Sequence, residues 1–327
     1  MKKTFSSLVH VNQRFQRSVN LLADQKEGAL LDSFLLQGSH LSCLNLISDY
    51  LVKTSQRAFT WTGPYGSGKS SLGLFFSGLV KGRESCFTKY TLSTENDEES
   101  RNSLHNFRDF LGNVDKWDVI TLVGRSGNLE KDFLVAVDSE EASLREGLPV
   151  FKERLQEQNK GALIFIDELG KYLEGSEGNH NCYALQEIAE FFNRGRSSII
   201  FVGILHQSFA GYASNLSRQQ QEEWMKVQGR FVDIPLLITA DESISLISNS
   251  LERDQSFSLP QEFTSLVGTV TRSLKKQKVD IEALSSSLCD CWPLNPISAL
   301  LLGPISKKRF LQNTRSIFSF LCSKEVK

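Results

Sequence analysis

The stretch AFTWTGPYGSGKSSL, residues 58–72, joins an apolar, strand-like run to a helix-like run through a glycine-rich turn. It contains the pattern GxxxxGK[ST], which starts at Gly63 and ends with Gly68, Lys69 and Ser70. Glycines permit positive φ angles and leave no Cβ between the backbone N–H groups and an anion. A helix that begins near Lys69 would direct its unpaired N–H groups and the positive end of its dipole at the same anion. The pattern therefore predicts a phosphate-binding loop.

Within this loop, Lys69 has the charge and the reach to contact the β- and γ-phosphates of a nucleoside triphosphate. The Ser70 hydroxyl can take one position in the octahedral shell of Mg²⁺. We therefore predict ATP and Mg²⁺ as cofactors, and the alternative is a chance glycine-rich start of a helix. The residues predicted to surround the nucleotide are Gly63, Pro64, Tyr65, Gly66, Ser67, Gly68, Lys69, Ser70 and Ser71.

The composition is that of an ordinary globular protein. Apolar residues make up 40% of the 327 residues and charged residues 23%, so a sizeable core can form. The 37 basic and 38 acidic residues give a net charge of -1, which excludes a global attraction to nucleic acid or anionic lipid. The N-terminus lacks an unbroken apolar run of the signal-peptide type, and no run reaches membrane-spanning length. We therefore expect a cytoplasmic protein with no membrane partner.

The cysteines are too few and too scattered to predict a disulfide framework or a zinc site. Cys289 and Cys291 are the closest pair, and even with Cys322 they have no fourth ligand at a usual spacing. We interpret all of the cysteines as free thiols. They are Cys43, Cys86, Cys182, Cys289, Cys291 and Cys322.

Hydrophobic patterns divide the chain into three parts. Residues 1–28 are polar without a clear period, and we interpret them as an N-terminal arm. Residues 29–238 alternate strand-like and helix-like runs, with an acidic helix inserted around residues 95–116. Residues 239–327 have helical periodicity. This order predicts an α/β fold in which a parallel sheet flanked by helices precedes a helical C-terminal region.

Three runs after the phosphate loop predict strands, at residues 118–123, 162–166 and 198–205. The last two are continuous apolar runs, as expected of strands buried in a parallel sheet. The second run is followed directly by Asp167 and Glu168. Carboxylates at the carboxyl end of a parallel strand lie in the crevice where ligands bind. We interpret Asp167 as a Mg²⁺ ligand and Glu168 as the base that orients and deprotonates the attacking water. The alternative is a strand followed by an acidic N-cap.

The last of these runs is followed by His206 and Gln207. A polar side chain at this edge of the sheet would lie between the two carboxylates and the γ-phosphate. It could position the water or sense the phosphate, and the sequence does not decide which of the two residues would do so. The alternative for His206 is a buried histidine with ordinary hydrogen bonds.

The order of these motifs resembles that of the AAA+ ATPases: GPYGSGKS, then LIFIDE, then a strand with a polar end, then GRFVD at residues 229–233. The resemblance implies a P-loop core followed by a helical lid. It also implies that Arg230 is an arginine finger that reaches the γ-phosphate of a neighbouring subunit, and therefore that the protein forms a homo-oligomer. A structural ion-pair arginine is the alternative. The segment QNTRSIFSFL is similar to the start of the third lid helix, which would make Arg315 a phosphate-sensing arginine.

Longer stretches are similar to the N-terminal ATPase modules of large bacterial ATP-binding proteins associated with phage defence, including the BREX type. They are RAFTWTGPYGSGKSSL, HQSFAGYA, EEWMKVQGRFVDIPL and PLNPISALLLGPISKKRFLQNTRSIFSFL. The resemblance implies ATP hydrolysis coupled to the remodelling or regulation of a partner in anti-phage defence. Because those proteins usually continue beyond the lid, a separate effector protein or a further domain is expected.

Two functions from different classes are compatible with these residues. The first is an ATPase, which the presence of Glu168 and Arg230 favours because a pure binding module needs neither a base nor a finger. The second is a nucleotide-gated switch or scaffold with slow turnover. Nucleic acid remains an unsupported alternative partner, since the basic clusters are most simply solvated helix faces. These clusters consist of Lys275, Lys276 and Lys278, and of Lys307, Lys308 and Arg309.

Overall fold

The structure is a computed structural model, and it divides into two compact units. It describes residues 8–12, 15, 19–26, 28–174, 178–213, 218–253, 258–274, 280–306 and 315–321. The larger unit comprises Val19–Gly63 and Gly68–Leu236. The smaller comprises Met1–Ser18, the loop residues Pro64–Ser67, and Leu237–Lys327.

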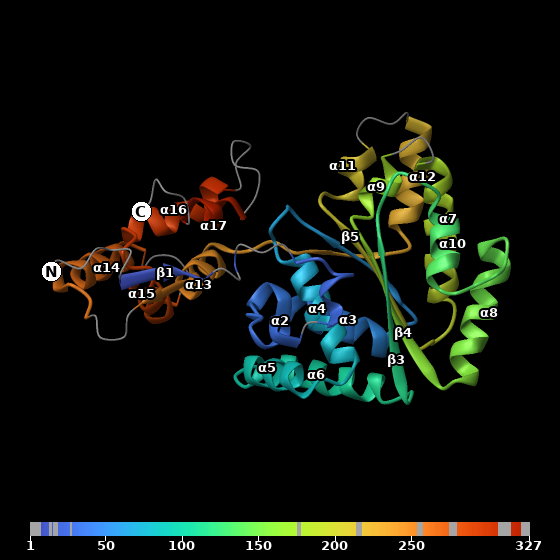
Figure 1. The fold of residues 1–327 in the computed structure, drawn as a ribbon, viewed down its shortest axis with the longest axis horizontal. Helices are drawn as coiled ribbons and strands as arrows, with labels where there is room; N and C mark the ends of the chain where they lie inside the picture. The colour runs from blue at the N-terminus through green and yellow to red at the C-terminus, as the bar shows by residue number, and fades with distance from the viewer. Residues whose placement is uncertain are drawn as a thin grey trace. The chain divides into compact units, whose positions relative to one another are not determined.

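The larger unit is built on a five-stranded sheet with the order β3-β4-β5-β2-β6, in which all neighbours run parallel (Figure 1). The strands are β2 (Ala58–Thr62), β3 (Lys116–Val123), β4 (Lys160–Asp167), β5 (Ile199–Leu205) and β6 (Val232–Pro235). Thr62 is level with Leu205, and Ile166 with Gly203. The glycine-rich loop after β2, Asp167 at the end of β4, Glu168 after it, and His206 after β5 therefore all lie at the carboxyl ends of strands, at one edge of the sheet.

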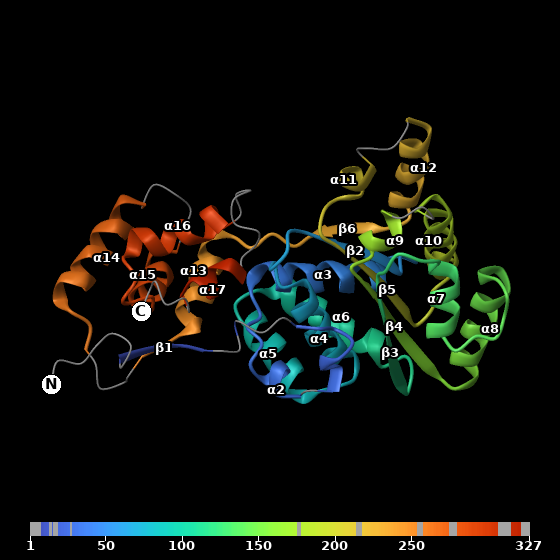
Figure 2. The same ribbon diagram turned by 45° about the horizontal axis from the view of Figure 1, so that its top comes forward.

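Helices cover both faces of this sheet (Figures 1 and 2). Helices α3 to α6 lie on one face, and α7, α8 and α10 lie on the other. The helices of this unit are α2 (Gly28–Asp32), α3 (Gly38–Lys53), α4 (Lys69–Val80), α5 (Glu84–Thr94), α6 (Glu98–Leu111), α7 (Leu129–Ala136), α8 (Leu144–Glu157), α9 (Gly170–Leu173), α10 (Gly178–Asn193), α11 (Phe209–Ala213) and α12 (Arg218–Gln228), with a 3₁₀ turn at Asp24–Lys26.

Burial on both faces explains why the central strands β4 and β5 are unbroken apolar runs. Side chains alternate across a strand, so Ile164 and Ile166 of β4 join the cluster on one face while Leu163 and Phe165 join the cluster on the other. All four are fully buried. A strand covered on both faces has no solvated side and therefore needs apolar residues at every position.

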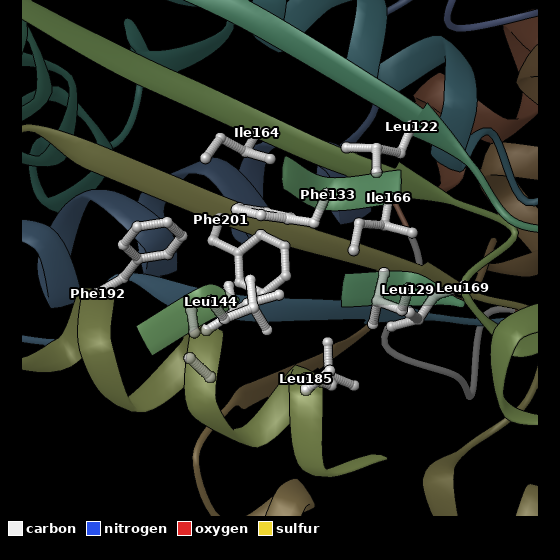
Figure 3. Packing of buried hydrophobic residues seen from close by; sticks show 14 of the residues in the cluster. Leu122, Leu129, Phe133, Leu144, Ile164, Ile166, Leu169, Leu185, Phe192 and Phe201 are labelled. Atoms are coloured by element: carbon white, nitrogen blue, oxygen red, sulfur yellow. The ribbon is translucent and has the colours of Figure 1, made fainter. Parts of the chain in front are cut away.

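Three phenylalanine rings pack among leucine and isoleucine side chains in the core between the sheet and α7 and α10 (Figure 3). Phe201 of β5 lies 6.4 Å from the Phe133 ring and 5.9 Å from the Phe192 ring, both in edge-on arrangements. These distances and orientations suit the quadrupoles of aromatic rings. Truncation of such a buried phenylalanine to alanine would destabilise the unit by about 3–5 kcal/mol.

In the part of the smaller unit that the structure describes, helices are joined by one short sheet. Strand β1 (Val9–Val11) pairs antiparallel with β7 (Leu251–Arg253), so part of the expected N-terminal arm belongs to this sheet. Buried Ile244, Ile247 and Leu288 contribute to the core. Its helices are α13 (Ala240–Ser250), α14 (Gln261–Ser273), α15 (Ile281–Asp290), α16 (Pro296–Ser306) and α17 (Arg315–Leu321).

The α/β fold predicted from the sequence, with its parallel sheet and helical C-terminal region, is confirmed. The acidic insertion corresponds to α6, whose N-cap Asp97 accepts hydrogen bonds from the N–H groups of Glu99 and Ser100. A further helix, α5, precedes it at residues that the sequence patterns left without a predicted element. Among the described residues, the helices are all too short or too polar to cross a membrane.

Candidate nucleotide-binding site

The glycine-rich turn has the backbone conformation that its sequence predicts. Gly66 and Gly68 adopt φ angles of 80° and 82°, in the left-handed region. Residues with a Cβ rarely adopt these angles, whereas glycine does so without strain. Gly68 is also the N-cap of α4, so the loop leads directly into the first turn of that helix. The exposed N-terminal amides of a helix are thereby placed at the end of the loop.

His40 packs against this turn, a contact that the sequence analysis missed. A Cβ on Gly68 would lie only 2.8 Å from His40 Nε2, so the close approach requires glycine. His40 is buried in the first turn of α3, and its ring lies 5.3 Å from that of Phe34. The sequence predicted only that a helix precedes β2. It gave no indication that His40 of this helix contacts the glycine-rich turn.

Lys69 is held inside the loop rather than in solvent. Its side chain is buried, and Nζ donates a hydrogen bond of 2.6 Å to the backbone oxygen of Gly63. The contact joins Lys69 to the first residue of the motif. A neutral carbonyl is a weaker partner for an ammonium group than a phosphate oxygen, so this position suits a phosphate ligand that replaces the carbonyl.

Ser70 and Asp167, the two predicted Mg²⁺ ligands, are in contact with each other. The Ser70 hydroxyl donates to Asp167 Oδ2 over 3.3 Å. Burial raises the pKa of Asp167, and the neighbouring charge of Glu168 acts in the same direction. The hydrogen bonds from the Glu168 N–H and from Ser70, together with the charge of Lys69, oppose this shift of the pKa. A hydroxyl and a buried carboxylate fit Mg²⁺, which prefers a few oxygen ligands of this kind.

Glu168 follows in an unusual backbone conformation, with a φ of 54°. Its N–H donates to Asp167 Oδ1 over 2.9 Å, and its carboxylate forms an ion pair with Lys171. Gly124, which follows β3, lies against this turn. A Cβ at Gly124 would be 2.0 Å from the backbone oxygen of Glu168. Neither Gly124 nor Lys171 belongs to a sequence motif, so neither was predicted as a site residue.

The structure separates the two candidates that follow β5. His206 is partly buried, and its Nε2 lies 4.0 Å from Glu168 Oε1. Gln207 is exposed, and it lies beside Gly211. The predicted proximity to the carboxylates therefore applies to His206.

Arg230 lies at the other end of the sheet. Phe59 of β2 is level with Val232 of β6, so Arg230 is near the amino end of β2, roughly 20 Å of strand away from Gly63. Its Nε donates to Glu190 Oε1 over 2.8 Å. The pKa of Glu190 is lowered, mainly by the hydrogen bond that Gln186 donates to its carboxylate. The hydrogen bond and the charge of Arg230 lower it further.

The remaining predicted residues are placed as follows. Ser67 is buried, and its N–H donates to the Pro64 oxygen over 3.3 Å, whereas Tyr65 is exposed. Ser71 lies in the first turn of α4 and is partly buried. Arg315 begins α17, but its side chain lies outside the described residues, as do the two basic clusters and Cys322.

The cysteines that the structure describes are free thiols. Burial raises the pKa of Cys182 and of Cys291 to about 12 in each case. Within the described ranges, His, Cys, Asp and Glu side chains do not gather in threes as a metal centre built from them would require. A Mg²⁺ ion at the nucleotide site would instead be held by Ser70 and Asp167 together with nucleotide oxygens.

Comparisons with known proteins find distant likenesses among solved structures. No protein-family model and no curated protein matches the chain. Among solved structures, the chain is similar to the ORC2 protein of Aeropyrum pernix in its ADP form, with 12% identity and a TM-score of 0.42 over 90% of this chain and 72% of that one. It is also similar to the same protein in ADPNP-ADP complexes, with 12% identity and a TM-score of 0.42 over 91% and 72% of the two chains. The ORC1 protein of Aeropyrum pernix in complex with DNA matches with 12% identity and a TM-score of 0.41 over 98% and 70%.

Proposed function

We propose that this protein binds ATP with Mg²⁺ and hydrolyses it. The observation that carries the proposal is the meeting of two motifs from distant parts of the sequence, with Ser70 Oγ 3.3 Å from Asp167 Oδ2. Lys69 is buried in the adjacent loop. A cation, a hydroxyl and a carboxylate at one helix N-terminus form a set suited to a metal-bound triphosphate.

Each residue has a separate task in this proposal. Lys69 holds the β- and γ-phosphates, and Ser70 and Asp167 hold the metal ion. Bound Mg²⁺ would neutralise charge that develops on the phosphate oxygens. Glu168 accepts a proton from the attacking water, and His206 supplies a polar group beside that carboxylate. The ion pair between Glu168 and Lys171 must loosen for Glu168 to act as the base.

Arg230 acts on the nucleotide of a neighbouring subunit in this proposal. Its position at the amino end of the sheet supports this role, because it is too distant from its own phosphate loop to contribute there. A half-exposed guanidinium group is also accessible to a second chain. We therefore propose a homo-oligomer with shared sites, in which Arg315 approaches the phosphates as a sensor.

The biological setting rests on the sequence likeness to ATPase modules of phage-defence proteins. We propose that hydrolysis remodels or regulates a partner in bacterial anti-phage defence, in the cytoplasm. The partner would be a separate effector protein or a further domain.

A nucleotide-gated switch is the second candidate function. The observation in its favour is the ion pair between Lys171 and the Glu168 carboxylate. This pairing would keep turnover slow, because Glu168 must be released before it can act as the base. Such a protein would respond to ATP binding more than to hydrolysis and would control a separate effector.

Phosphate release by the purified protein, measured with and without Mg²⁺ over a range of protein concentrations, tests the proposal. We expect Mg²⁺-dependent turnover whose specific rate rises with protein concentration. Tight ATP binding with less than one turnover per hour at every concentration would favour the switch. Absence of ATP binding by calorimetry would exclude both functions.

A further inference from the structure

The helical hairpin of α11 and α12 brings a tyrosine to the edge of the sheet where the candidate catalytic residues lie. This hairpin follows β5 directly after His206 and Gln207. Tyr212, in α11, contacts two elements of the site but is not itself a predicted site residue. Its contacts with His206 and Gly170 suggest a structural role at the site.

The first contact is with the backbone of His206. The His206 N–H donates to the Tyr212 hydroxyl over 3.4 Å. This amide lies at the end of β5, and the ring of the same residue faces the Glu168 carboxylate at 4.0 Å. The phenol hydroxyl therefore holds the backbone that carries the imidazole.

The second contact is with Gly170, two residues after Glu168. A Cβ on Gly170 would lie 2.2 Å from the Tyr212 hydroxyl oxygen and 2.4 Å from Cζ, so the tyrosine fits only against a glycine. Gly170 begins α9, whose next residue, Lys171, pairs with Glu168. One side chain thus contacts both segments that position the Glu168 and His206 side chains.

The Tyr212 ring packs against a cluster of buried aromatic rings. The Tyr212 ring stacks on Trp224 of α12 with centroids 6.4 Å apart and an interplanar angle of 25°. Trp224 contacts Phe209, which contacts Phe231, and all three are buried. Because close-packed side chains move only at the expense of their neighbours, Tyr212 has little freedom to shift.

We propose that Tyr212 is a positioning residue for ATP hydrolysis: it clamps the end of β5 and the start of α9 so that His206 and Glu168 keep a fixed separation. This inference rests on the proposed ATPase function. In this proposal the α11–α12 hairpin supports the residues at the carboxyl end of the sheet. Tyr212 itself does not contact the nucleotide.

The Tyr212→Phe variant tests the clamp, because it keeps the ring on Trp224 and removes only the hydroxyl. We expect kcat for ATP to fall on the order of 3- to 10-fold with KM and the affinity for a non-hydrolysable ATP analogue unchanged. The matched control is Tyr183→Phe, at an exposed tyrosine of α10, which should retain parental rates. An unchanged kcat in Tyr212→Phe, or an equal fall in both variants, would overturn the proposal.

A rescue experiment tests the contact with Gly170. Gly170→Ala should lower kcat because the new methyl group pushes Tyr212 away. Combining it with Tyr212→Ala makes room for that methyl group, so the double variant should be no slower than Tyr212→Ala alone. If the two losses multiply instead, the residues act independently and the clamp is wrong.

Amide hydrogen exchange without nucleotide separates this inference from the ATPase proposal. In Tyr212→Phe, the His206 amide and the segment 168–173 should exchange faster, with the thermal unfolding midpoint unchanged. Equal protection in parent and variant would overturn the clamp even if the parent hydrolyses ATP. Faster exchange in the variant of a parent that shows no turnover would support the clamp and refute the ATPase.

Discussion

Lys69 and Arg230 are both expected to approach a triphosphate, yet the structure surrounds them very differently. Lys69 is 4% exposed and bonds to a neutral backbone oxygen within its own loop. Arg230 has a side chain that is 47% exposed and bonds to the carboxylate of Glu190. One cation is buried against the backbone, and the other is accessible and paired with an acidic side chain.

This difference fits the separate roles proposed for the two cations. A buried ammonium that bonds to a carbonyl oxygen gains a great deal from a multiply charged anion, because the surroundings screen the attraction weakly. An exposed ion pair contributes little to stability, so Arg230 can exchange Glu190 for another anion at small cost. The first arrangement suits a resident nucleotide, and the second suits a group that arrives with a second subunit.

Lys69→Ala should give the largest effect, because it removes the one charged side chain of the motif GPYGSGKS. We expect ATP affinity to fall by more than about 10³-fold in calorimetric titrations. Lys131→Ala, at an exposed lysine of α7, is the control and should bind like the parent. Equal affinity in Lys69→Ala and the parent would remove the assignment of the phosphate loop.

Arg230→Ala comes next, with hydrolysis reduced on the order of 10³-fold and ATP binding retained. Steady-state turnover and calorimetry on the same preparation measure the two effects. Arg194→Ala serves as the control, because Arg194 lies 3.6 Å from the same Glu190 carboxylate and is not expected to reach a phosphate.

Mixing Arg230→Ala with Lys69→Ala sharpens this test. Hybrid interfaces then pair an intact phosphate loop with an intact finger, so some activity should return. If the mixture stays inactive and the parent is fully active as a monomer at low nanomolar concentration, Arg230 belongs to the fold of its own chain.

Glu168→Gln should bind ATP normally and hydrolyse it on the order of 10²-fold more slowly, since the amide keeps the size but cannot accept the proton. Single-turnover kinetics with pre-bound ATP isolate this step. Glu157→Gln, at an exposed position of α8, should leave the rate unchanged. A parental rate in Glu168→Gln would mean that the base lies elsewhere.

Glu190→Gln should give the smallest effect. Removing the carboxylate frees Arg230, so half-maximal specific activity should occur at a protein concentration about 2- to 3-fold lower, in line with the small energy of an exposed ion pair. Lowering the pH does not substitute for this variant, because Asp167, whose pKa is raised, takes up its proton before Glu190, whose pKa is lowered. Glu187→Gln, exposed on the same helix, is the control. A higher half-maximal concentration would show that the pair helps assembly.

Much of the larger unit was predictable because its signals are local. The unbroken apolar run of β4 reflects burial on both faces, and the glycines of the phosphate loop reflect their left-handed φ angles. The pairing of β1 with β7 was not predictable in the same way. Two three-residue strands separated by most of the chain carry little periodic signal, and their partner choice depends on how the helices of that unit pack.

The sequence by itself determined the glycine-rich turn before α4, the two carboxylates at the carboxyl end of β4 and the α/β order of the core. These features depend on backbone conformation, side-chain chemistry and burial, each of which produces a recognisable pattern in a short stretch of sequence. Only the tertiary structure decided that His206 rather than Gln207 faces Glu168, that Gly124 and Gly170 make room for their neighbours, and that Glu190 holds Arg230. Such contacts join segments far apart in the chain, and close packing in three dimensions selects them.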